Sequence, residues 1–339
     1  MNGTLITFIV PAYNSDQTLR RCLDSFIHPD LLPLIEIIVV NDGSNDETES
    51  IATSYTLEYS SFRIINKENG GHGSVINLAC QEAKGKYFKI VDSDDKILTE
   101  NIAAFIKGLL YSNSDVILTH FQTLDYRNGY VREYRMRDID YGQEYIFEEL
   151  WANKKNVASV MHLHGMTYST EFYRSCELKL TEHISYEDQE FTVIPFAKKP
   201  TITPLDVLLE EYSLGNTGQS TSGQSLAKNL PHLEEVFWKL EDASKNLQGA
   251  AVDYFFYKRC ELLLVCFMAA MLKSPDKRSG RQWVRSLRKQ VQARNQVIYS
   301  ATKRHYYICL LLSLLGFTED KVARLHKYRL YRIAARFLH

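Results

Sequence analysis

The chain has 339 residues, of which 45% are hydrophobic and 24% charged, with a formal net charge of -1 at pH 7. This composition allows a large buried core and excludes an intrinsically disordered chain, and the length suits one large domain with a smaller second unit. The six cysteines form no CxxC pair and lie mostly in apolar stretches, which favours reduced thiols over a disulfide framework.

The first 120 residues alternate short apolar runs with amphipathic helical stripes, which is typical of βα units around a mostly parallel sheet. Strands are predicted at Thr4–Val10, Ile35–Val40, Arg63–Ile65, Tyr87–Val91 and Asp115–Thr119. Apolar residues at helical spacing predict one helix from Leu19 to Phe26 and another from Ile102 to Leu109.

The remainder of the chain predicts a boundary between two domains. From Tyr126 to Pro204 charged loops mix with isolated aromatic residues, and a polar stretch follows at Gly215–Gln224. Beyond it the sequence is helical in pattern to His339. We therefore expect an α/β domain over residues 1–222 and a helical C-terminal domain over residues 223–339.

Neither end of the chain suggests secretion or a membrane span. Residues 1–10 lack a basic leader and enter a strand directly, so the sequence predicts a cytoplasmic protein. The apolar runs Leu262–Leu272 and Tyr306–Phe317 are shorter than the roughly 20 residues that cross a bilayer and indicate buried helices.

Basic residues are concentrated in the last part of the chain, from residue 273 onward, whereas acidic residues predominate before it. Two predicted amphipathic helices carry this charge. The first contains Arg281, Trp283, Val284, Arg285, Leu287, Arg288, Lys289, Val291 and Arg294, and the second spans Tyr328–Phe337. Peripheral contact with an anionic membrane and a solvated face of the helical domain are both compatible with this pattern. No nucleic-acid-binding module accompanies the charge, so nucleic acid is not expected as a partner.

Polar residues follow three of the predicted strands, in the segments Val10–Asn14, Val40–Ser44 and Val91–Asp95. Because open parallel sheets bind ligands at the carboxyl ends of their strands, these segments predict one shared site. Asp92, Asp94 and Asp95 place three carboxylates within four residues, and a divalent cation would relieve their repulsion. Oxygen ligands suit Mg²⁺ or Mn²⁺. The competing interpretation of the three aspartates is an ordinary helix N-cap.

The Gly-rich turn Asn69–Ser74 precedes a helical stripe, and its backbone N–H groups could approach a phosphate. The first strand is followed by Pro11–Asn14 rather than by GxGxxG, which argues against a dehydrogenase. The Walker pattern GxxxxGK[ST] is also absent from the sequence.

In order and spacing these segments resemble the family 2 glycosyltransferases of the GT-A fold. The matching pieces are Ile9–Asn14, Val39–Thr48, Asn69–Gly71, Gly85–Tyr87 and Asp92–Asp95. The resemblance is strong over residues 4–120, looser to about residue 220 and absent beyond. It implies a GT-A type, Rossmann-like, mostly parallel α/β sheet with flanking helices, in which residues 1–120 bind the nucleotide sugar and residues 121–222 the acceptor.

The resemblance also implies roles for individual residues at a site for a UDP-sugar donor. Pro11, Ala12, Tyr13 and Asn14 would frame the nucleoside, Asp42 would accept a hydrogen bond from the base, and Asp92 would lie near the ribose. Gly71 and Ser93 complete the predicted donor site. Asp94 would bind the Mn²⁺ or Mg²⁺ that bridges to the diphosphate, with Asp95 as a helper.

The segment Tyr186–Phe191 resembles the acidic motif that follows in this family, and we predict Asp188 as the catalytic base. A carboxylate that takes the proton of the attacking hydroxyl contributes roughly 10²–10⁴-fold to the rate. Attack opposite the leaving diphosphate would invert the anomeric centre. Glu187 and Glu190 remain rivals, and an acidic helix start is the alternative interpretation.

Two further segments belong to the predicted acceptor half. His162-Leu163-His164 alternates like a strand, with both imidazoles on one face, and His164 is expected to line the acceptor pocket or to be a satisfied core histidine rather than a metal ligand. Gly215–Ser220 has the composition of a lid but departs from the basic closing motif of processive members, so this chain alone is not expected to make a long polymer.

The predicted function is inverting transfer of a hexose or N-acetylhexosamine from a UDP-sugar to a glycan, lipid-linked or protein-linked acceptor. A nucleotidyltransferase is an alternative, but its Gly/Arg-rich loop and Pro-Lys pair are missing. A non-catalytic scaffold would have no need of both Asp94 and Asp188. Association with the inner face of the plasma membrane and formation of a homo-oligomer are left open.

Overall fold

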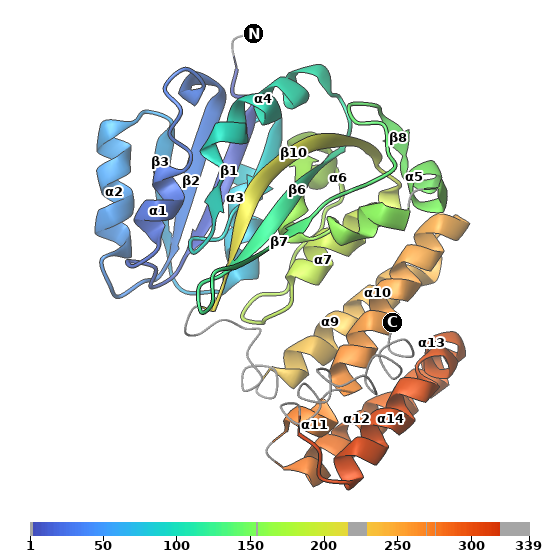
Figure 1. Cartoon of the computed structure of the whole chain (residues 1–339). Coiled ribbons are helices and arrows are strands. Elements are labelled where there is room, and N and C mark those ends of the chain that lie inside the picture. Colours follow the sequence, from blue (N-terminus) through green and yellow to red (C-terminus); the bar gives the residue numbers. More distant parts are fainter. Residues whose placement is uncertain (1–2, 154, 216–228, 269, 275, 319–339) are drawn as a thin grey trace. The chain divides into compact units, whose positions relative to one another are not determined.

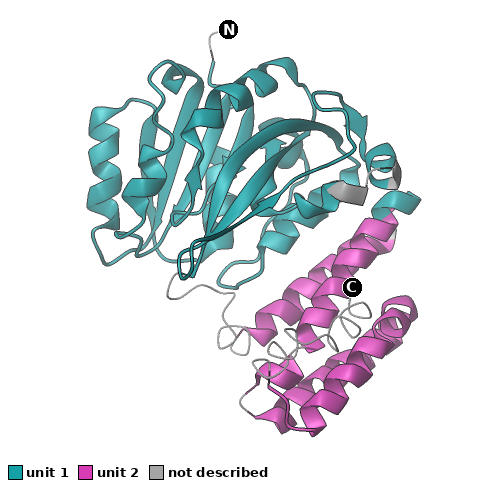
Figure 2. Ribbon diagram, in the orientation of Figure 1, with its two compact units in different colours: residues 1–217, 248–252 teal, residues 218–247, 253–339 magenta. Residues whose placement is uncertain are grey.

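The computed structural model describes residues 3–153, 155–215, 229–268, 270–274 and 276–318, and the chain divides into two compact units (Figures 1 and 2). Unit 1 comprises residues 1–217 and 248–252, and unit 2 comprises residues 218–247 and 253–339. The predicted boundary at residue 223 and most of the predicted lid, residues 216–220, lie outside the described residues.

Unit 1 is built on a sheet of ten strands, and its first half is parallel. In this half β1 (Ile6–Ala12) lies between β2 (Ile35–Asp42) and β4 (Tyr87–Ile90), and β3 (Phe62–Lys67) lies beyond β2. β1 and β2 are buried along their whole length, because helices cover both faces, and this explains their nearly continuous apolar sequences. The strands predicted here are confirmed, with the first displaced by two residues.

The second half of the sheet is mixed. β9 (Met166–Ser169) lies antiparallel between β4 and β6 (Val116–Asp125), and β10 (Thr201–Leu214) pairs in parallel with β6. Three short strands complete the sheet: β5 (Lys96–Ile97), β7 (Tyr130–Tyr134) and β8 (Tyr145–Ile146). The predicted GT-A type α/β fold is confirmed, and the insertion of β9 makes its second half less parallel than the first.

Helices pack on both faces of this sheet (Figure 1). α1 (Leu19–Asp24), α2 (Thr48–Glu58) and α4 (Ile102–Tyr111) share a core with alternate residues of β1 and β2, while α3 (His72–Glu82) contacts the opposite face. Phe8 lies at the centre of that core, with its ring 4.8 Å from that of Phe26 and 6.3 Å from that of Phe105. The two helical stripes predicted in this half are therefore buried as expected.

Shorter helices connect the strands of the second half. They are α5 (Phe147–Asn153), α6 (Thr170–Ser175), α7 (Asp188–Val193) and the 3-10 helices η2 (Thr99–Asn101), η3 (Lys155–Ser159), η4 (Leu163–Gly165) and η5 (Ile194–Lys198). In the first half, the 3-10 helix η1 (Leu32–Leu34) directly precedes β2. α7 begins at Asp188, so the predicted base lies at a helix start.

The described part of unit 2 is helical, as the sequence predicts. Its helices are α9 (Leu230–Ala243), η6 (Ser244–Asn246), α10 (Ala250–Met268, whose first three residues belong to unit 1), α11 (Ala270–Lys273), α12 (Lys277–Arg294), α13 (Gln296–Ala301) and α14 (Lys303–Leu314). The expectation that the apolar run Tyr306–Phe317 is buried is wrong, because Tyr307, Leu311, Leu314 and Leu315 are exposed. Within the residues that the structure describes, no helix is both long enough and apolar enough to span a bilayer.

Helix α12 packs its apolar side into unit 2, and one of its predicted surface charges is buried. The guanidinium of Arg288 lies 4.3 Å from the ring centre of Tyr299 and 4.6 Å from that of Tyr306, and it donates a hydrogen bond of 2.8 Å to Thr302. The grouping of Arg288 with the solvent-facing charges is therefore wrong, because stacking and hydrogen bonding stabilise its charge inside the unit. Arg285 and Lys289 are exposed.

The other predicted basic residues differ in their surroundings. Arg281 donates to Ser313 Oγ at 3.1 Å, and Arg294 donates to Glu241 Oε2 at 2.8 Å while covering the ring of Trp238. These contacts tie α12 to α14 and α9 within unit 2. The second basic helix, predicted at 328–337, lies outside the described residues.

Candidate active site at the strand ends

The ends of β1 and β2 are joined by hydrogen bonds just beyond the sheet. The backbone N–H of Asn14 donates to Ser44 Oγ at 3.0 Å, and its side-chain oxygen accepts from the backbone N–H of Asn45 at 2.9 Å. Pro11 and Ala12 are buried below this junction, whereas the ring of Tyr13 is exposed beside it. The structure thus brings the first two predicted strand ends together and leaves the Tyr13 ring accessible to a ligand.

Asp42 holds the Gly-rich turn against the end of β2. Its Oδ1 accepts from Lys67 Nζ at 2.7 Å and from the backbone of Gly70 at 2.9 Å, and its Oδ2 accepts from the backbone of Gly71 at 2.8 Å. Gly71 has a φ of 81°, a conformation that favours glycine. Asp42 is only 3% exposed, and its role in the structure is to hold this turn in place. Its contact with the base of a nucleotide stays a prediction.

The acidic segment after β4 alternates between outward and inward side chains. Asp92 and Asp94 are partly exposed, while Ser93 and Asp95 are buried. Oxygen atoms from Asp92, Asp94 and Asp95 all lie within 4.8 Å of one another, a donor set that fits a hard divalent cation. The two partly exposed aspartates are the members of the set that a cation and a diphosphate could reach from the surface.

Residues of the first βα unit hold this acidic segment in place. The Arg21 guanidinium donates to the backbone oxygen of Asp94, and the Ser15 and Ser93 hydroxyls are 2.7 Å apart. Arg21 also donates to Ser213 Oγ at 3.0 Å, which connects the segment to the end of β10. These contacts hold the backbone of the acidic segment at Asp94.

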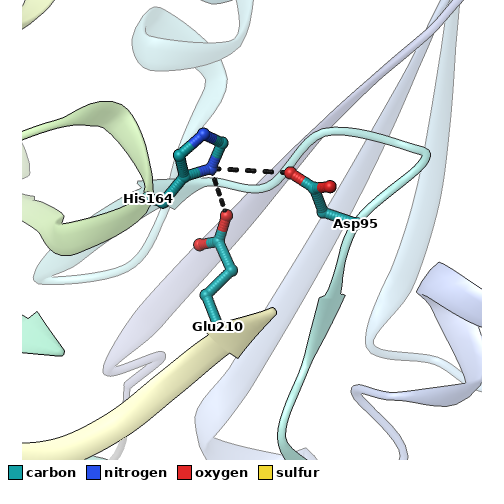
Figure 3. Close-up of side chains that lie close together, drawn as sticks. All are labelled: Asp95, His164 and Glu210. Atoms are coloured by element: carbon teal, nitrogen blue, oxygen red, sulfur yellow. Dashed lines mark hydrogen bonds and ion pairs between the residues drawn. The ribbon is translucent and has the colours of Figure 1, made fainter. Parts of the chain in front are cut away.

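A buried ion-pair network lies behind the acidic segment (Figure 3). His164 Nδ1 is 2.7 Å from Glu210 Oε1 and 3.5 Å from Asp95 Oδ2, and Glu210 Oε2 is 2.8 Å from Lys89 Nζ. Asp95, Lys89 and Glu210 are fully buried. Burial first, and then the neighbouring carboxylates of Asp92 and Glu210, raise the pKa of Asp95 well above its usual range.

This network has the ligand types of a metal site, because Asp95, His164 and Glu210 offer atoms within 4.8 Å of one another. Lys89, however, already neutralises Glu210, and it also donates to the backbone oxygen of His164 at 2.6 Å. A cation added here would repel that buried ammonium group. We therefore interpret the network as a support for the acidic segment, and the outward-facing aspartates as the better cation site.

The strand-like alternation predicted at His162-Leu163-His164 is wrong, because residues 163–165 form the 3-10 helix η4. The backbone turns where Gly165 packs so closely that a β-carbon would lie 2.0 Å from the backbone oxygen of Val160. Of the two roles predicted for His164, the structure supports the satisfied core histidine. Its ring stacks on Tyr212 at 4.1 Å in addition to its contacts with Glu210 and Asp95.

Asp188 is the most accessible carboxylate of the later acidic motif. Glu190 is fully buried and accepts hydrogen bonds from Thr181 at 2.9 and 2.7 Å, and Glu187 is buried against His72. Asp188 is partly exposed and accepts from the Gln189 side chain at 3.0 Å. Both rivals for the role of base are therefore occupied by structural contacts.

Burial first, and then the neighbouring Glu187 carboxylate, raise the pKa of Asp188 above its usual range, although Gln189, His72 and His164 act in the opposite direction. A carboxylate with a raised pKa holds a proton more strongly and is a better general base near neutral pH.

His72 is a site residue that sequence reasoning missed. Its Nε2 lies 3.0 Å from Asp92 Oδ1 and its Nδ1 lies 2.7 Å from Glu187 Oε1, so one imidazole joins the acidic strand end to the motif that contains Asp188. Burial alone would lower the pKa of His72, but Asp92 and Glu187 raise it well above its usual value. The sequence shows His72 only as part of a Gly-rich turn, because its partners are 20 and 115 residues away.

The sequence profile of Glycosyl transferase family 2 matches residues 7–176, which include the three polar strand ends and His72. The chain belongs to this family. An uncharacterized glycosyltransferase of Mycoplasma pneumoniae is 37% identical over 120 residues, covering 34% of this chain and 39% of that protein. An uncharacterized glycosyltransferase of Rickettsia prowazekii is 42% identical over 115 residues, covering 34% of this chain and 35% of the relative.

EpsJ of Bacillus subtilis, also an uncharacterized glycosyltransferase, is 27% identical over 205 residues, or 60% of this chain and 59% of that protein. The chain therefore spans less than two thirds of each of these relatives. Among solved structures, residues 1–349 of S. aureus TarS in complex with UDP-GlcNAc give a TM-score of 0.69 at 19% identity, covering 93% of each chain. This likeness supports the GT-A fold of unit 1, and the aligned region also extends into the helical unit 2.

Proposed function

We propose that this chain is an inverting glycosyltransferase that moves a hexose or N-acetylhexosamine from a UDP-sugar to a hydroxyl group of a glycan, lipid-linked or protein-linked acceptor. The observation that carries the proposal is the meeting of Asp92 and Glu187 on the two nitrogens of His72, at 3.0 and 2.7 Å. Asp94 lies two residues after Asp92, and Asp188 directly follows Glu187. Glycosyl transfer needs a group that binds the leaving diphosphate and a group that takes the acceptor proton within one site.

On the donor side, the segment after β1 and the Gly-rich turn would receive the nucleotide. We assign Pro11, Ala12, Tyr13, Asn14, Asp42, Gly71, Asp92 and Ser93 to donor binding. The exposed ring of Tyr13 supports this assignment, since an aromatic face beside a strand end can stack on a base. The contacts of Asp42 with Gly70 and Gly71 would keep the turn in place while the donor binds.

Asp94 is the proposed ligand of Mn²⁺ or Mg²⁺, with Asp92 next to it and Asp95 supporting the segment from behind. A cation bound there would neutralise charge on the diphosphate leaving group. The backbone contact of Arg21 with Asp94 would hold the segment at a fixed position during binding. The alternative cluster around His164 is less suitable because Lys89 already occupies Glu210.

On the acceptor side, Asp188 would take the proton from the attacking hydroxyl. The acceptor oxygen then forms a bond to the anomeric carbon, the bond from that carbon to the diphosphate oxygen breaks, and UDP leaves with the electron pair. Because attack and departure occur on opposite faces, the anomeric configuration inverts. Burial and Glu187 raise the pKa of Asp188, which supports this role.

The choice of uridine can be tested by thermal protection. UDP-GlcNAc is the first donor to test because the S. aureus TarS structure contains it, and GDP-mannose is the natural competitor because it is present with Mn²⁺ in a mannosyltransferase structure of TM-score 0.50. With Mn²⁺ present, we expect UDP-GlcNAc, UDP-glucose or UDP-galactose to raise the melting temperature. Protection by GDP-mannose alone would show that the donor nucleotide has been assigned wrongly.

Contact of unit 2 with an anionic membrane is a separate proposal that depends on the exposed Arg285 and Lys289. Replacing both with Gln should reduce sedimentation with vesicles rich in anionic lipid, because each basic residue near such a surface contributes about 1 kcal/mol. The matched control replaces the exposed Lys84 and Lys107 of unit 1 with Gln. If the two double variants bind the vesicles equally, or if the unmodified protein does not bind them, the proposed membrane contact is wrong and α12 only packs within unit 2.

A further inference from the structure

We propose that His72 is a positioning residue that sets the spacing between the donor-binding strand end and the segment that carries the base. The inference rests on the proposed function, in which Asp188 is the base and Asp94 the cation ligand. His72 would touch neither the acceptor nor the cation. It would act through Asp92 and Glu187, the two carboxylates on its ring nitrogens.

Both ring nitrogens of His72 face hydrogen-bond acceptors. Nε2 lies 3.0 Å from an oxygen of Asp92 and Nδ1 lies 2.7 Å from an oxygen of Glu187, so a single imidazole joins the two carboxylates. The Glu187 side chain is only 6% exposed, and without His72 its charge would be buried without this partner. Loss of the imidazole should therefore displace Glu187 rather than leave it unchanged.

The backbone around His72 is packed directly against the segment that precedes Asp188. A β-carbon on Gly73 would lie 2.4 Å from the backbone oxygen of Thr181, and one on Gly71 would lie 3.1 Å from the backbone nitrogen of His183. The N–H of His183 donates to the backbone oxygen of Gly70 at 2.8 Å. The Gly-rich turn and residues 181–183 therefore touch through their main chains, which only small residues in the turn allow.

One turn further along α3, a side-chain amide extends this contact. Asn77 donates to the backbone oxygen of Leu180 at 3.0 Å and accepts from the backbone N–H of Leu180 at 2.8 Å. The base-bearing segment is thus fastened to α3 at Leu180 and again at Glu187, which bonds to His72 at the start of the same helix.

Between these two attachments the chain adopts unfavourable backbone conformations. His183 has a φ of 60° and Tyr186 a φ of 75°, in the left-handed region that costs non-glycine residues energy. A segment in such a conformation persists only where its surroundings hold it. The His72–Glu187 bond lies directly after Tyr186 and directly before Asp188, so we infer that it holds the base in place.

Two substitutions separate the two halves of this role. The amide of Gln can replace Nε2, which preserves the contact with Asp92, whereas the shorter Asn replaces Nδ1 and preserves the contact with Glu187.

Turnover is measured as release of UDP from UDP-GlcNAc with water as acceptor, and donor affinity as binding of UDP with Mn²⁺. For His72→Gln we expect turnover to fall by about 10- to 100-fold with UDP affinity within about twofold of the unmodified protein, because a small displacement of a reacting group has a cost of this order. For His72→Asn we expect the larger loss in UDP affinity.

A second readout does not depend on any substrate. Amide hydrogen exchange at His183, whose N–H donates to the backbone oxygen of Gly70, reports whether this segment remains attached to the Gly-rich turn. We expect exchange there to be faster by about tenfold or more in His72→Gln and close to that of the unmodified protein in His72→Asn. His120→Gln is the matched control, because His120 is a buried histidine bonded to Asp206 elsewhere in unit 1.

The outcomes distinguish this inference from the proposed function. If the unmodified protein neither binds UDP nor releases it from UDP-GlcNAc, the proposed donor is wrong, while the exchange comparison still decides whether His72 holds the segment. Unchanged exchange in His72→Gln would overturn the inference. It would also be overturned if both His72 variants lost turnover and affinity in the same proportion.

Discussion

Asp188→Asn is expected to lower turnover by roughly 10²–10⁴-fold while leaving the affinity for UDP and Mn²⁺ almost unchanged. Asn keeps the shape of the side chain and the contact with Gln189, but its amide cannot take a proton from the acceptor. An interaction that matters mainly in the transition state affects turnover rather than donor binding. Initial rates with UDP-GlcNAc and calorimetric titration with UDP measure the two quantities separately.

The control for this variant is Asp30→Asn, an exposed aspartate in unit 1 outside the proposed site. It removes the same charge and should retain normal rates. Near-normal turnover in Asp188→Asn, or a product with the anomeric configuration of the donor, would contradict the assignment. Glu187 and Glu190 would then be the next residues to test, although both are buried in structural contacts.

The pH dependence of turnover follows from the same residue. Burial and Glu187 raise the pKa of Asp188, so the carboxyl group becomes protonated at a higher pH than an ordinary aspartate. Because only the ionised form takes a proton, activity should fall as the pH decreases through this raised pKa. When the pH is lowered, activity should therefore begin to fall at a higher pH than the one at which a solvent-exposed aspartate titrates. Rates measured across this pH range test the expectation.

Asp94→Asn is expected to remove the metal-dependent part of UDP binding and to lower turnover by roughly 10²-fold or more, since charge neutralisation by a bound cation is worth several kcal/mol. The substitution replaces an anionic ligand with a neutral one at a partly exposed position. The hydrogen bond from Arg21 to the backbone oxygen of Asp94 does not involve the substituted group, so the segment should keep its position and the protein its melting temperature.

The measurement for Asp94 is calorimetric titration of UDP with and without Mn²⁺. In the unmodified protein the cation should strengthen binding, and in Asp94→Asn the two titrations should nearly coincide. Glu100→Gln, at an exposed acid six positions further along the chain, is the matched control and should keep the full effect of Mn²⁺. An undiminished effect of Mn²⁺ in Asp94→Asn would remove this residue from the proposed cation site.

The first, parallel half of the sheet could be predicted because its signals are local. A strand covered on both faces has a continuous apolar sequence, and the polar residues after it mark its carboxyl end, as β1, β2 and the segment Asp92–Asp95 show. Because the strands are parallel, their carboxyl ends lie at one edge of the sheet, and no long-range contact has to be known to predict this. For this reason the proximity of Asn14, Ser44 and the acidic segment follows from pattern alone.

The second half of the site depends on contacts between distant parts of the sequence, which one sequence does not display. Glu210 belongs to β10, a strand of 14 residues that the mixed pattern around it concealed, and it meets Lys89 and His164 only in the folded sheet. The 3-10 helix at His164 depends on the close packing of Gly165 against Val160, which alternation of residue types cannot reveal.

The basic helix of unit 2 illustrates a different limit. Its spacing predicts an amphipathic helix, and α12 is one, yet the spacing does not predict that Arg288 is enclosed by Tyr299 and Tyr306. A charge pattern gives the number of basic residues on a helix but not their partners. The structure shows which basic residues of α12 are exposed and could contact a membrane, such as Arg285 and Lys289.

The central claim is that Asp94 holds the cation beside the donor diphosphate while Asp188 faces the anomeric carbon from the other side. A crystal structure of the protein with UDP-GlcNAc and Mn²⁺, with Mn²⁺ located by its anomalous scattering, tests both parts at once. We expect one peak that is coordinated by Asp94 and the diphosphate, with Asp188 opposite the leaving group. A peak between Asp95, His164 and Glu210 instead, or Asp188 on the same side as the diphosphate, would contradict it.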